Sequence, residues 1–325
     1  MVYPRHVALR IHLLSTINRD YVVPFRVMVH SLHRSRRSTQ PVTWHIFESD
    51  LRPADRGAIQ TQLERAAIDI AWHRYDDQRL MGLPIWGRMV IGMYQKMLVP
   101  EALPATISRM IYLDADLLVL DAIESLWNAD ISGSIIGAVQ DMVIPFVSSP
   151  LGLSRYRDLG CQAMDPYFNA GMFIVDLNAW REYQVGKKAI EYVHRHERSI
   201  NLADQDALNA VLHDRWTCVA DRWNIIGSVA GRAFFEPKGL DVTRLTAALR
   251  EPGIVHFAGY LKPWTYRGLG SRWAAAYTHC LLEVLPEFRF HGTLKARSIA
   301  IYDRRLRSVL YPLESLVWRM SRHLR

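Results

Sequence analysis

The segment from residue 109 to residue 120, RMIYLDADLLVL, leads an apolar, β-prone run into two carboxylates, Asp114 and Asp116. This pattern is typical of a buried strand that ends at a cation. Carboxylate oxygens suit a hard divalent ion such as Mg²⁺ or Mn²⁺, and in proteins such an ion usually bridges to phosphate oxygens. We therefore expect a bound diphosphate at the end of this strand. The alternative is that Asp116 caps a turn and Asp114 faces water.

Strand and helix patterns alternate along the rest of the chain. They predict strands over residues 6–16, 42–47, 68–73, 134–139 and 168–176, and helices over residues 21–34, 53–65, 89–100, 177–196 and 204–213. Such alternation predicts an α/β protein with a largely parallel sheet that helices cover on both faces. The Pro-, Ser- and Gly-rich segment 145–152 is expected to be a lid or a binding loop.

Composition narrows the class of protein. Half of the 325 residues are apolar, so the chain can bury a large core. The cysteines Cys161, Cys218 and Cys280 are widely spaced without a CxxC pattern, which argues against a disulfide framework or a zinc site and for a reducing compartment. The N-terminal residues make a poor signal peptide, and no run approaches the roughly 20 apolar residues of a membrane-spanning helix. We therefore expect a cytoplasmic protein.

The C-terminal segment is more basic than the rest. The net charge of the chain is +8, and residues 281–325 hold nine Lys/Arg against four Asp/Glu. Residues 304–324 repeat apolar side chains at spacings of three and four between arginines, which is typical of a basic amphipathic helix on an anionic membrane. Packing of this stripe on the catalytic domain or on a second subunit is the alternative. We therefore predict a catalytic domain over residues 1–280 and a helical tail over residues 281–325, with peripheral attachment at the inner face of a membrane.

Four short motifs follow in order and carry a family resemblance. They are LDAD at residues 113–116, YFNAG at residues 167–171, ADQD at residues 203–206 and HFAGYLKPW at residues 256–264. Together they resemble glycosyltransferase family 8, the retaining sugar-nucleotide-dependent transferases that include glycogenin and bacterial lipopolysaccharide galactosyltransferases. The resemblance covers about residues 7 to 280. It implies a GT-A type, Rossmann-like nucleotide-binding fold with a mixed, mainly parallel sheet.

The resemblance implies a metal site of three ligands, Asp114, Asp116 and His256. A neutral imidazole beside carboxylates favours Mn²⁺ over Mg²⁺, although Mg²⁺ stays an alternative. Lys262 matches a residue that adds a second positive charge to the departing diphosphate, and Gly259 permits close backbone approach to it. The alternative for His256 is an interior histidine with satisfied hydrogen bonds. Trp264 of the same motif is expected to pack rather than to contact a ligand.

Four further matches concern the donor sugar. Asn169 matches an asparagine that hydrogen-bonds the transferred sugar, and Gly171 stands where side-chain bulk would obstruct a ligand. Asp141 matches a residue that holds donor-sugar hydroxyls, with a helix or turn cap as the alternative. Arg88 matches a basic residue that spans nucleotide and sugar by charge-assisted hydrogen bonds. The alternative for Arg88 is a solvated helix face.

Asp204 and Gln205 bear on the mechanism. Retention of configuration needs a nucleophile on the face opposite the leaving group or a same-face pathway through an oxocarbenium-like pair. The resemblance places Gln205 near the reactive carbon, where its amide oxygen stabilises positive charge transiently. It implies that Asp204 fixes the sugar and helps to orient that amide. The alternative for Asp204 is an N-cap of its helix.

The nucleotide site departs from the family pattern. Many relatives read Asp-Asp-Asn-Tyr after the first strand, whereas residues 18–21 here are Asn-Arg-Asp-Tyr. Asn18 is expected to bond a uracil edge, Asp20 the ribose hydroxyls, and Tyr21 to stack on the base. A changed nucleobase is the alternative. The resemblance also places Ala115 among the donor-binding residues.

These observations predict a retaining enzyme that moves a hexose, galactose or glucose, from a UDP-sugar to a hydroxyl of a glycan or lipid-linked acceptor. The rivals are a catalytically silent nucleotide-sugar or glycan-binding protein and a dehalogenase-type phosphatase. The phosphatase motif favours Thr or Val two residues after its second acid, where this chain has Leu118. Nucleic-acid binding rests on charge alone, and we expect no such partner.

Overall fold

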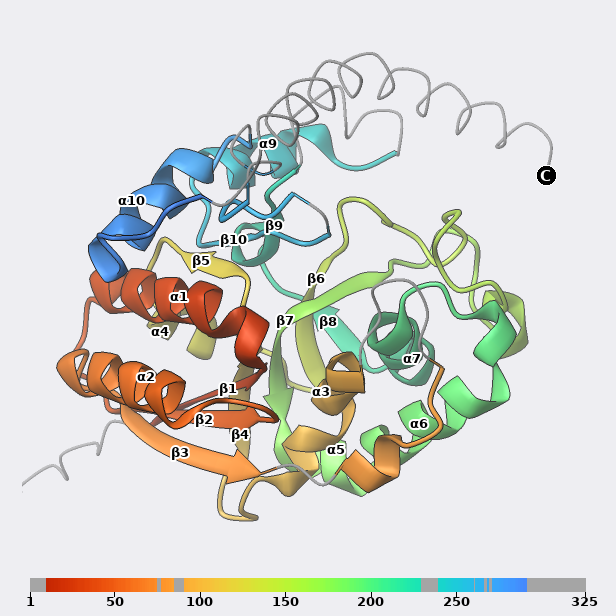
Figure 1. Cartoon of the computed structure of the whole chain (residues 1–325). Helices are drawn as coiled ribbons and strands as arrows, with labels where there is room; N and C mark the ends of the chain where they lie inside the picture. Colours follow the sequence, from red (N-terminus) through yellow and green to blue (C-terminus); the bar gives the residue numbers. More distant parts are fainter. Residues whose placement is uncertain are drawn as a thin grey trace, which may run out of the picture.

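The computed structural model describes residues 10–74, 77–84, 91–228, 239–259, 261–265, 268 and 271–290. Its main feature is a seven-stranded sheet in the order β3-β2-β1-β4-β7-β6-β8 (Figure 1). The strands are β1 (Ile11–Ile17), β2 (Val42–Glu48), β3 (Asp69–Arg74), β4 (Arg109–Leu113), β6 (Ile136–Gln140), β7 (Phe168–Asp176) and β8 (Trp216–Cys218). β7 runs antiparallel to its neighbours β4 and β6, and the other neighbours are parallel. The predicted mixed, mainly parallel sheet is confirmed.

Helices cover both faces of this sheet (Figure 1). One face packs against α1 (Val22–Ser35) and α2 (Pro53–Arg65), and the other against α3 (Ile91–Ala102), α5 (Leu177–Glu182), α6 (Val185–Arg195) and α7 (Ala203–Leu212). The start of α2 shows how local sequence sets a boundary. Pro53 occupies the first turn, and the Asp55 carboxylate accepts the backbone N–H of Arg52 at 3.1 Å.

A second sheet lies beside the first and was not predicted. It has three strands in the order β5-β10-β9, which are β5 (Leu117–Val119), β10 (Ile254–His256) and β9 (Ile225–Ile226). The chain leaves the large sheet at the end of β4 and enters the small one at β5, so Asp114 and Asp116 lie in the connection. β10 pairs antiparallel with β5, and His256 is opposite Leu117. This register brings His256 next to Asp116.

The remaining elements are short or peripheral. They are α4 (Ile123–Trp127), α9 (Val242–Arg250), α10 (Ala274–Val284), η1 (Arg19–Tyr21), η2 (Asp77–Leu80), η3 (Tyr156–Leu159), η4 (Glu197–Ser199) and η5 (Asp221–Asn224). α9 and α10 pack with the small sheet in a third apolar core. None of the helices in the described part of the chain has both the length and the apolar character to span a bilayer.

Two predicted helices differ in the structure. The single helix expected over residues 177–196 is two helices, α5 and α6, because Gln184 has a left-handed backbone with φ of 56° and interrupts the helical path. The helix expected to end at Pro100 continues to Ala102. Pro100 removes one intrahelical hydrogen bond, and only two residues of the helix follow it.

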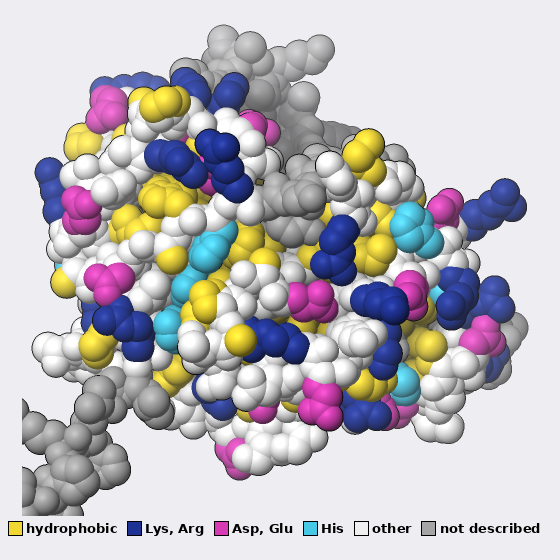
Figure 2. Space-filling view, turned by 90° about the horizontal axis from the view of Figure 1, so that it is seen from below, with side chains coloured by type: hydrophobic (Ala, Val, Ile, Leu, Met, Phe, Trp, Pro, Cys, Tyr) yellow, Lys and Arg dark blue, Asp and Glu magenta, His cyan; other side chains and the backbone are white. Residues whose placement is uncertain are grey.

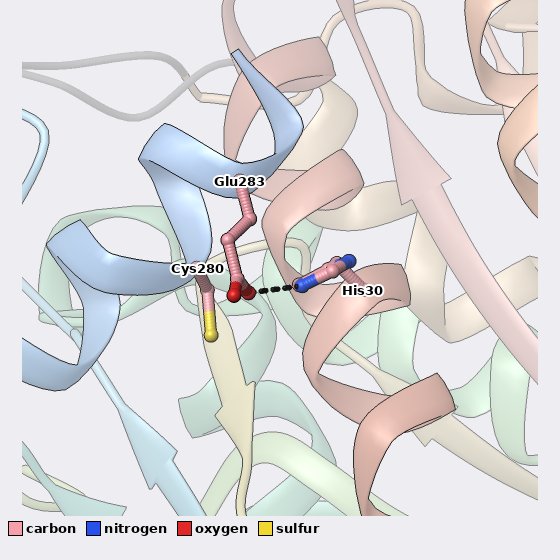
Figure 3. A group of neighbouring side chains, drawn as sticks. All are labelled: His30, Cys280 and Glu283. Carbon is pink, nitrogen blue, oxygen red and sulfur yellow. Dashed lines mark hydrogen bonds and ion pairs between the residues drawn. The ribbon is translucent and has the colours of Figure 1, made fainter. Parts of the chain in front are cut away.

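α10 is fastened to α1 by an ion-pair cluster (Figure 3). The carboxylate of Glu283 lies 2.7 Å from His30 Nε2 and 2.6 Å from Arg34 Nη1, with Cys280 beside it. Hydrogen bonds from Arg34 and His30 lower the pKa of Glu283 from 4.5 to about 2. The predicted domain boundary after residue 280 falls inside α10. Residues 291–325 of the predicted tail lie outside the described residues.

Candidate active site

Asp114, Asp116 and His256 converge at the junction of the two sheets. Nε2 of His256 lies 3.3 Å from Oδ1 of Asp116 and 4.0 Å from Oδ2 of Asp114. One ligand-type atom from each residue lies within 4.8 Å of the others. Two backbone hydrogen bonds fix this junction: Asp114 N–H donates to Gly171 O at 2.8 Å, and Phe257 N–H donates to Asp116 O at 3.0 Å. The structure thus brings together the three residues expected to hold a cation.

Gly171 makes room for the imidazole. A Cβ at this position would lie 2.1 Å from Cε1 of His256 and 2.6 Å from Nδ1. Bulk here would therefore displace the histidine, whereas the sequence argument expected it to obstruct a ligand. Gly259 also differs in its reason: a Cβ would meet no atom within 4 Å, but φ is +75°, a left-handed conformation that favours glycine.

Lys262 folds back onto the carboxylates. Its ammonium pairs with Asp116 Oδ2 and donates to the carbonyl of Phe257 at 2.7 Å. Burial by itself would lower the pKa of Lys262. The negative charge of Asp116 and, to a smaller extent, Tyr21 raise this pKa by more than burial lowers it, so the net shift is upward. Burial alone would raise the pKa of Asp116, but Lys262 and His256 hold it well below its ordinary value. Lys262 is thus a fixed cation beside the acids.

Lys96 belongs to this cluster and was not predicted from the sequence. It lies on α3, and its Nζ is 2.9 Å from Asp114 Oδ1, 2.9 Å from Asp204 Oδ2 and 3.2 Å from the carbonyl of Ala170. The side chain is 7% exposed. The sequence did offer one signal, which is that Lys96 stands alone in a mostly apolar helical segment. A lysine buried in such a segment needs an anionic partner, so its position could have pointed to a nearby carboxylate.

Asp141 organises the residues around it. Its Oδ1 accepts the backbone N–H groups of Val143 at 2.7 Å and Ile144 at 2.9 Å. Its Oδ2 accepts from Asn169 Nδ2 at 2.8 Å and Gln205 Nε2 at 3.2 Å. These four donors fill the lone pairs of the carboxylate, so Asp141 is the turn cap that the alternative foresaw. Its contact with sugar hydroxyls stays a prediction.

The first turn of α7 carries two carboxylates and one amide, each with its own partners. Gln205 Oε1 accepts the backbone N–H of Ala170 at 3.0 Å, which sets Gln205 beside Asn169. The N-cap is Leu202, so the alternative of Asp204 as an N-cap is wrong. Asp206 instead accepts the backbone N–H of Leu202 at 3.1 Å and the hydroxyl of Tyr167 at 2.5 Å. Asp204 is left to pair with Lys96.

Of the residues predicted to bind the nucleotide, Tyr21 lies near this junction. Tyr21 packs edge-on against Trp264 at 6.2 Å between ring centroids, and Lys262 Nζ lies 5.9 Å from the Tyr21 ring. Asn18 caps η1 by accepting the Tyr21 backbone N–H at 3.2 Å, while Asp20 is exposed. Trp264 packs on Tyr21 and Tyr277, as expected. 

Two further predicted residues complete the set. Ala115 is buried between the two aspartates of the junction. Arg88 lies outside the described residues.

Comparisons with known proteins agree with this architecture. The family described as glycosyl transferase family 8 matches residues 12–268. General stress protein A of Bacillus subtilis is 26% identical over 78% of this chain and 87% of that protein. The lipopolysaccharide 1,2-glucosyltransferase of Escherichia coli is 25% identical over 76% of this chain and 70% of its own length.

The solved structure of the galactosyltransferase LgtC, in complex with donor and acceptor sugar analogues, has a TM-score of 0.69 to this chain at 22% identity. The match covers 89% of this chain and 99% of that one. This likeness confirms the expected GT-A type fold. Because the family match spans most of the sequence, the chain belongs to glycosyltransferase family 8 and is a glycosyltransferase.

Proposed function

We propose that this enzyme transfers a hexose from a UDP-sugar to a hydroxyl acceptor with retention of configuration, using Mn²⁺ held by Asp114, Asp116 and His256. The observation that carries the proposal is the convergence of these three side chains from β4, β5 and β10. A binding protein without turnover would not need such a concentration of charge at a leaving-group site.

The three residues fit a divalent cation. An ion held at about 2.1 Å from each ligand keeps its ligand atoms about 3 to 4.2 Å apart. The separations of 3.3 and 4.0 Å between His256 Nε2 and the two carboxylates lie in that range. A mixed set of two carboxylates and one imidazole suits Mn²⁺. When bound, such an ion acts as a Lewis acid on the departing diphosphate.

The two lysines have separate roles beside these acids. Lys262 would donate to the diphosphate from the side of Asp116, and Lys96 holds Asp114 and Asp204 in place from the opposite side. Both ammonium groups are largely buried, so their charge acts in a medium of low dielectric constant. The expected effect of the Lys262 charge is to favour departure of the nucleoside diphosphate.

Gln205 and Asp204 would act on the sugar. Gln205 Nε2 donates to Asp141, and Gln205 Oε1 accepts the backbone N–H of Ala170. These two hydrogen bonds hold the amide beside Asn169. A fixed amide oxygen near the reactive carbon would stabilise positive charge as the glycosidic bond breaks. We assign Gln205 this electrostatic role and Asn169 and Asp204 the positioning of the donor.

The names of the relatives support a choice of donor and acceptor. One relative is a lipopolysaccharide glucosyltransferase, and a structural neighbour is a galactosyltransferase. We infer that UDP-galactose and UDP-glucose are the leading donors and that the acceptor is a hydroxyl of a lipopolysaccharide-type glycan or glycolipid. 

The test is release of UDP from a panel of UDP-sugars, with Mn²⁺, with Mg²⁺ and with EDTA. We expect turnover with Mn²⁺ and a UDP-hexose, loss of turnover in EDTA, and a decrease of about 100-fold or more for Asp116→Asn. Asp158→Asn is the matched control, since Asp158 is exposed in η3 and pairs with Arg155. Undiminished turnover in EDTA or in Asp116→Asn would refute the proposed site.

A further inference from the structure

The side-chain amide of Asn169 has only one possible orientation. Its Oδ1 accepts the backbone N–H of Gly171 at 3.0 Å, and its Nδ2 donates to the Asp141 carboxylate at 2.8 Å. A backbone N–H can only donate, and an ionised carboxylate can only accept. Exchanging the amide oxygen and nitrogen would therefore break both hydrogen bonds.

Asn169 in turn orients Asn224, the last residue of η5. Asn224 Nδ2 donates to Asn169 Oδ1 at 2.9 Å, whereas the exchanged orientation would set two amide oxygens against each other. Asn224 Oδ1 consequently faces Nδ1 of His256 at 3.2 Å. The three side chains are buried.

Nδ1 of His256 must then carry the ring proton. Two amide oxygens face it, Asn224 Oδ1 at 3.2 Å and Asn169 Oδ1 at 3.1 Å. Asn169 Oδ1 already receives N–H groups from Gly171 and Asn224, which occupy its two lone pairs. Asn224 Oδ1 is therefore the acceptor with capacity for the imidazole N–H. Nε2, which faces Asp116 and Asp114, is then the ring nitrogen that can give a lone pair to a cation.

We propose that Asn224 is a positioning residue of the cation site. It holds His256 in the Nδ1–H tautomer and in the ring orientation that directs Nε2 toward a divalent ion. The inference rests on the proposed function of His256 as a ligand. Hydrogen bonds to the nitrogen that does not bind the metal fix the tautomer of a ligating histidine, and their loss typically weakens metal affinity about 10- to 100-fold.

The experiment measures the tautomer and the metal affinity separately. The ¹⁵N chemical shifts of the His256 ring, assigned with His256→Gln, report the tautomer in metal-free protein. Titration with Mn²⁺ in the absence of donor gives the dissociation constant. We expect Asn224→Leu to populate both tautomers and to bind Mn²⁺ about 10-fold or more weakly.

The control is Asp221→Asn, which alters the same η5 but at a residue that pairs with Arg244. It should leave both readouts unchanged. If Asn224→Leu keeps the wild-type tautomer and the wild-type affinity for Mn²⁺, the proposal is wrong. If the leucine variant does not fold, Asn224→Ser replaces it in the same two measurements. 

His256→Ala separates this inference from the proposed function. If His256→Ala weakens Mn²⁺ binding and Asn224→Leu does not, the role of Asn224 alone is wrong. If His256→Ala binds Mn²⁺ like the wild type, the cation site itself is wrong, and the role of Asn224 falls with it.

Discussion

At the scale of residues, one buried lysine is shared by two carboxylates of the candidate site. Lys96 offers one positive charge to the carboxylates of Asp114 and Asp204. Burial would lower the pKa of Lys96, but these carboxylates raise it well above its ordinary value. The pKa of Asp204 is also raised, because burial outweighs its share of the ammonium charge. One cation thus serves two anions, and its removal would leave them uncompensated.

We therefore expect Lys96→Met to lower the free energy of unfolding by about 3–5 kcal/mol, less whatever proton uptake by Asp204 restores. UDP release should fall at the same time. Lys96→Arg keeps the charge and should be milder on stability. Urea unfolding at pH 7 measures the loss of stability. If the unfolding midpoint of Lys96→Met equals that of the wild type, Lys96 does not compensate Asp114 and Asp204 in the way described.

At the scale of elements, the three strands at one edge of the large sheet share a row of histidines. His12 Nδ1 lies 3.0 Å from His45 Nε2, and His45 Nδ1 lies 3.0 Å from His73 Nε2. Figure 2 shows histidine side chains in such a row on the face seen from below. Burial, with smaller contributions from His12 and His73, lowers the pKa of His45 from 6.5 to about 3.

This row predicts a pH dependence of stability. The folded state keeps His45 neutral, whereas the unfolded chain takes up a proton near pH 6.5. The free energy of unfolding is therefore not reduced by His45 above pH 6.5. As the pH falls from 6.5 toward 3, protonation of His45 in the unfolded chain lowers the free energy of unfolding by at most about 1.4 kcal/mol per pH unit. His45→Gln should flatten the loss of stability between pH 7 and 5, and His33→Gln, exposed on α1, should not. Equal slopes in all three proteins would disprove the assignment.

Elements with a local signal were predictable from the sequence, and those that depend on distant partners were not. The helix over residues 53–65 and the strand over residues 168–176 have the predicted bounds, since proline placement and a long apolar run mark them. β5 and β9 have three and two residues, too few to show a periodicity. Lys96 and Asn224 were not predicted because their partners are distant in the sequence and only the tertiary fold brings them together.

At the scale of the whole molecule, the candidate site joins two sheets with separate cores. Asp114 follows β4 of the large sheet, Asp116 precedes β5 of the small one, and His256 ends β10. α3 and α7 add Lys96 and Asp204 from the covering layer of the large sheet. A cation at the junction would therefore link segments from both sheets, and its binding should stabilise the chain as a whole.

Mn²⁺ together with UDP is accordingly expected to raise the unfolding temperature. At 100 times the dissociation constant, linkage adds about 2.7 kcal/mol, which is roughly 4 °C for a chain of this size. EDTA should remove the shift and His256→Ala should abolish it. A second cluster, His30, Cys280 and Glu283, also gathers ligand-type atoms, on α1 and α10. If His256→Ala keeps the shift and Glu283→Gln loses it, the ion binds between these helices and the junction of the sheets is not the cation site.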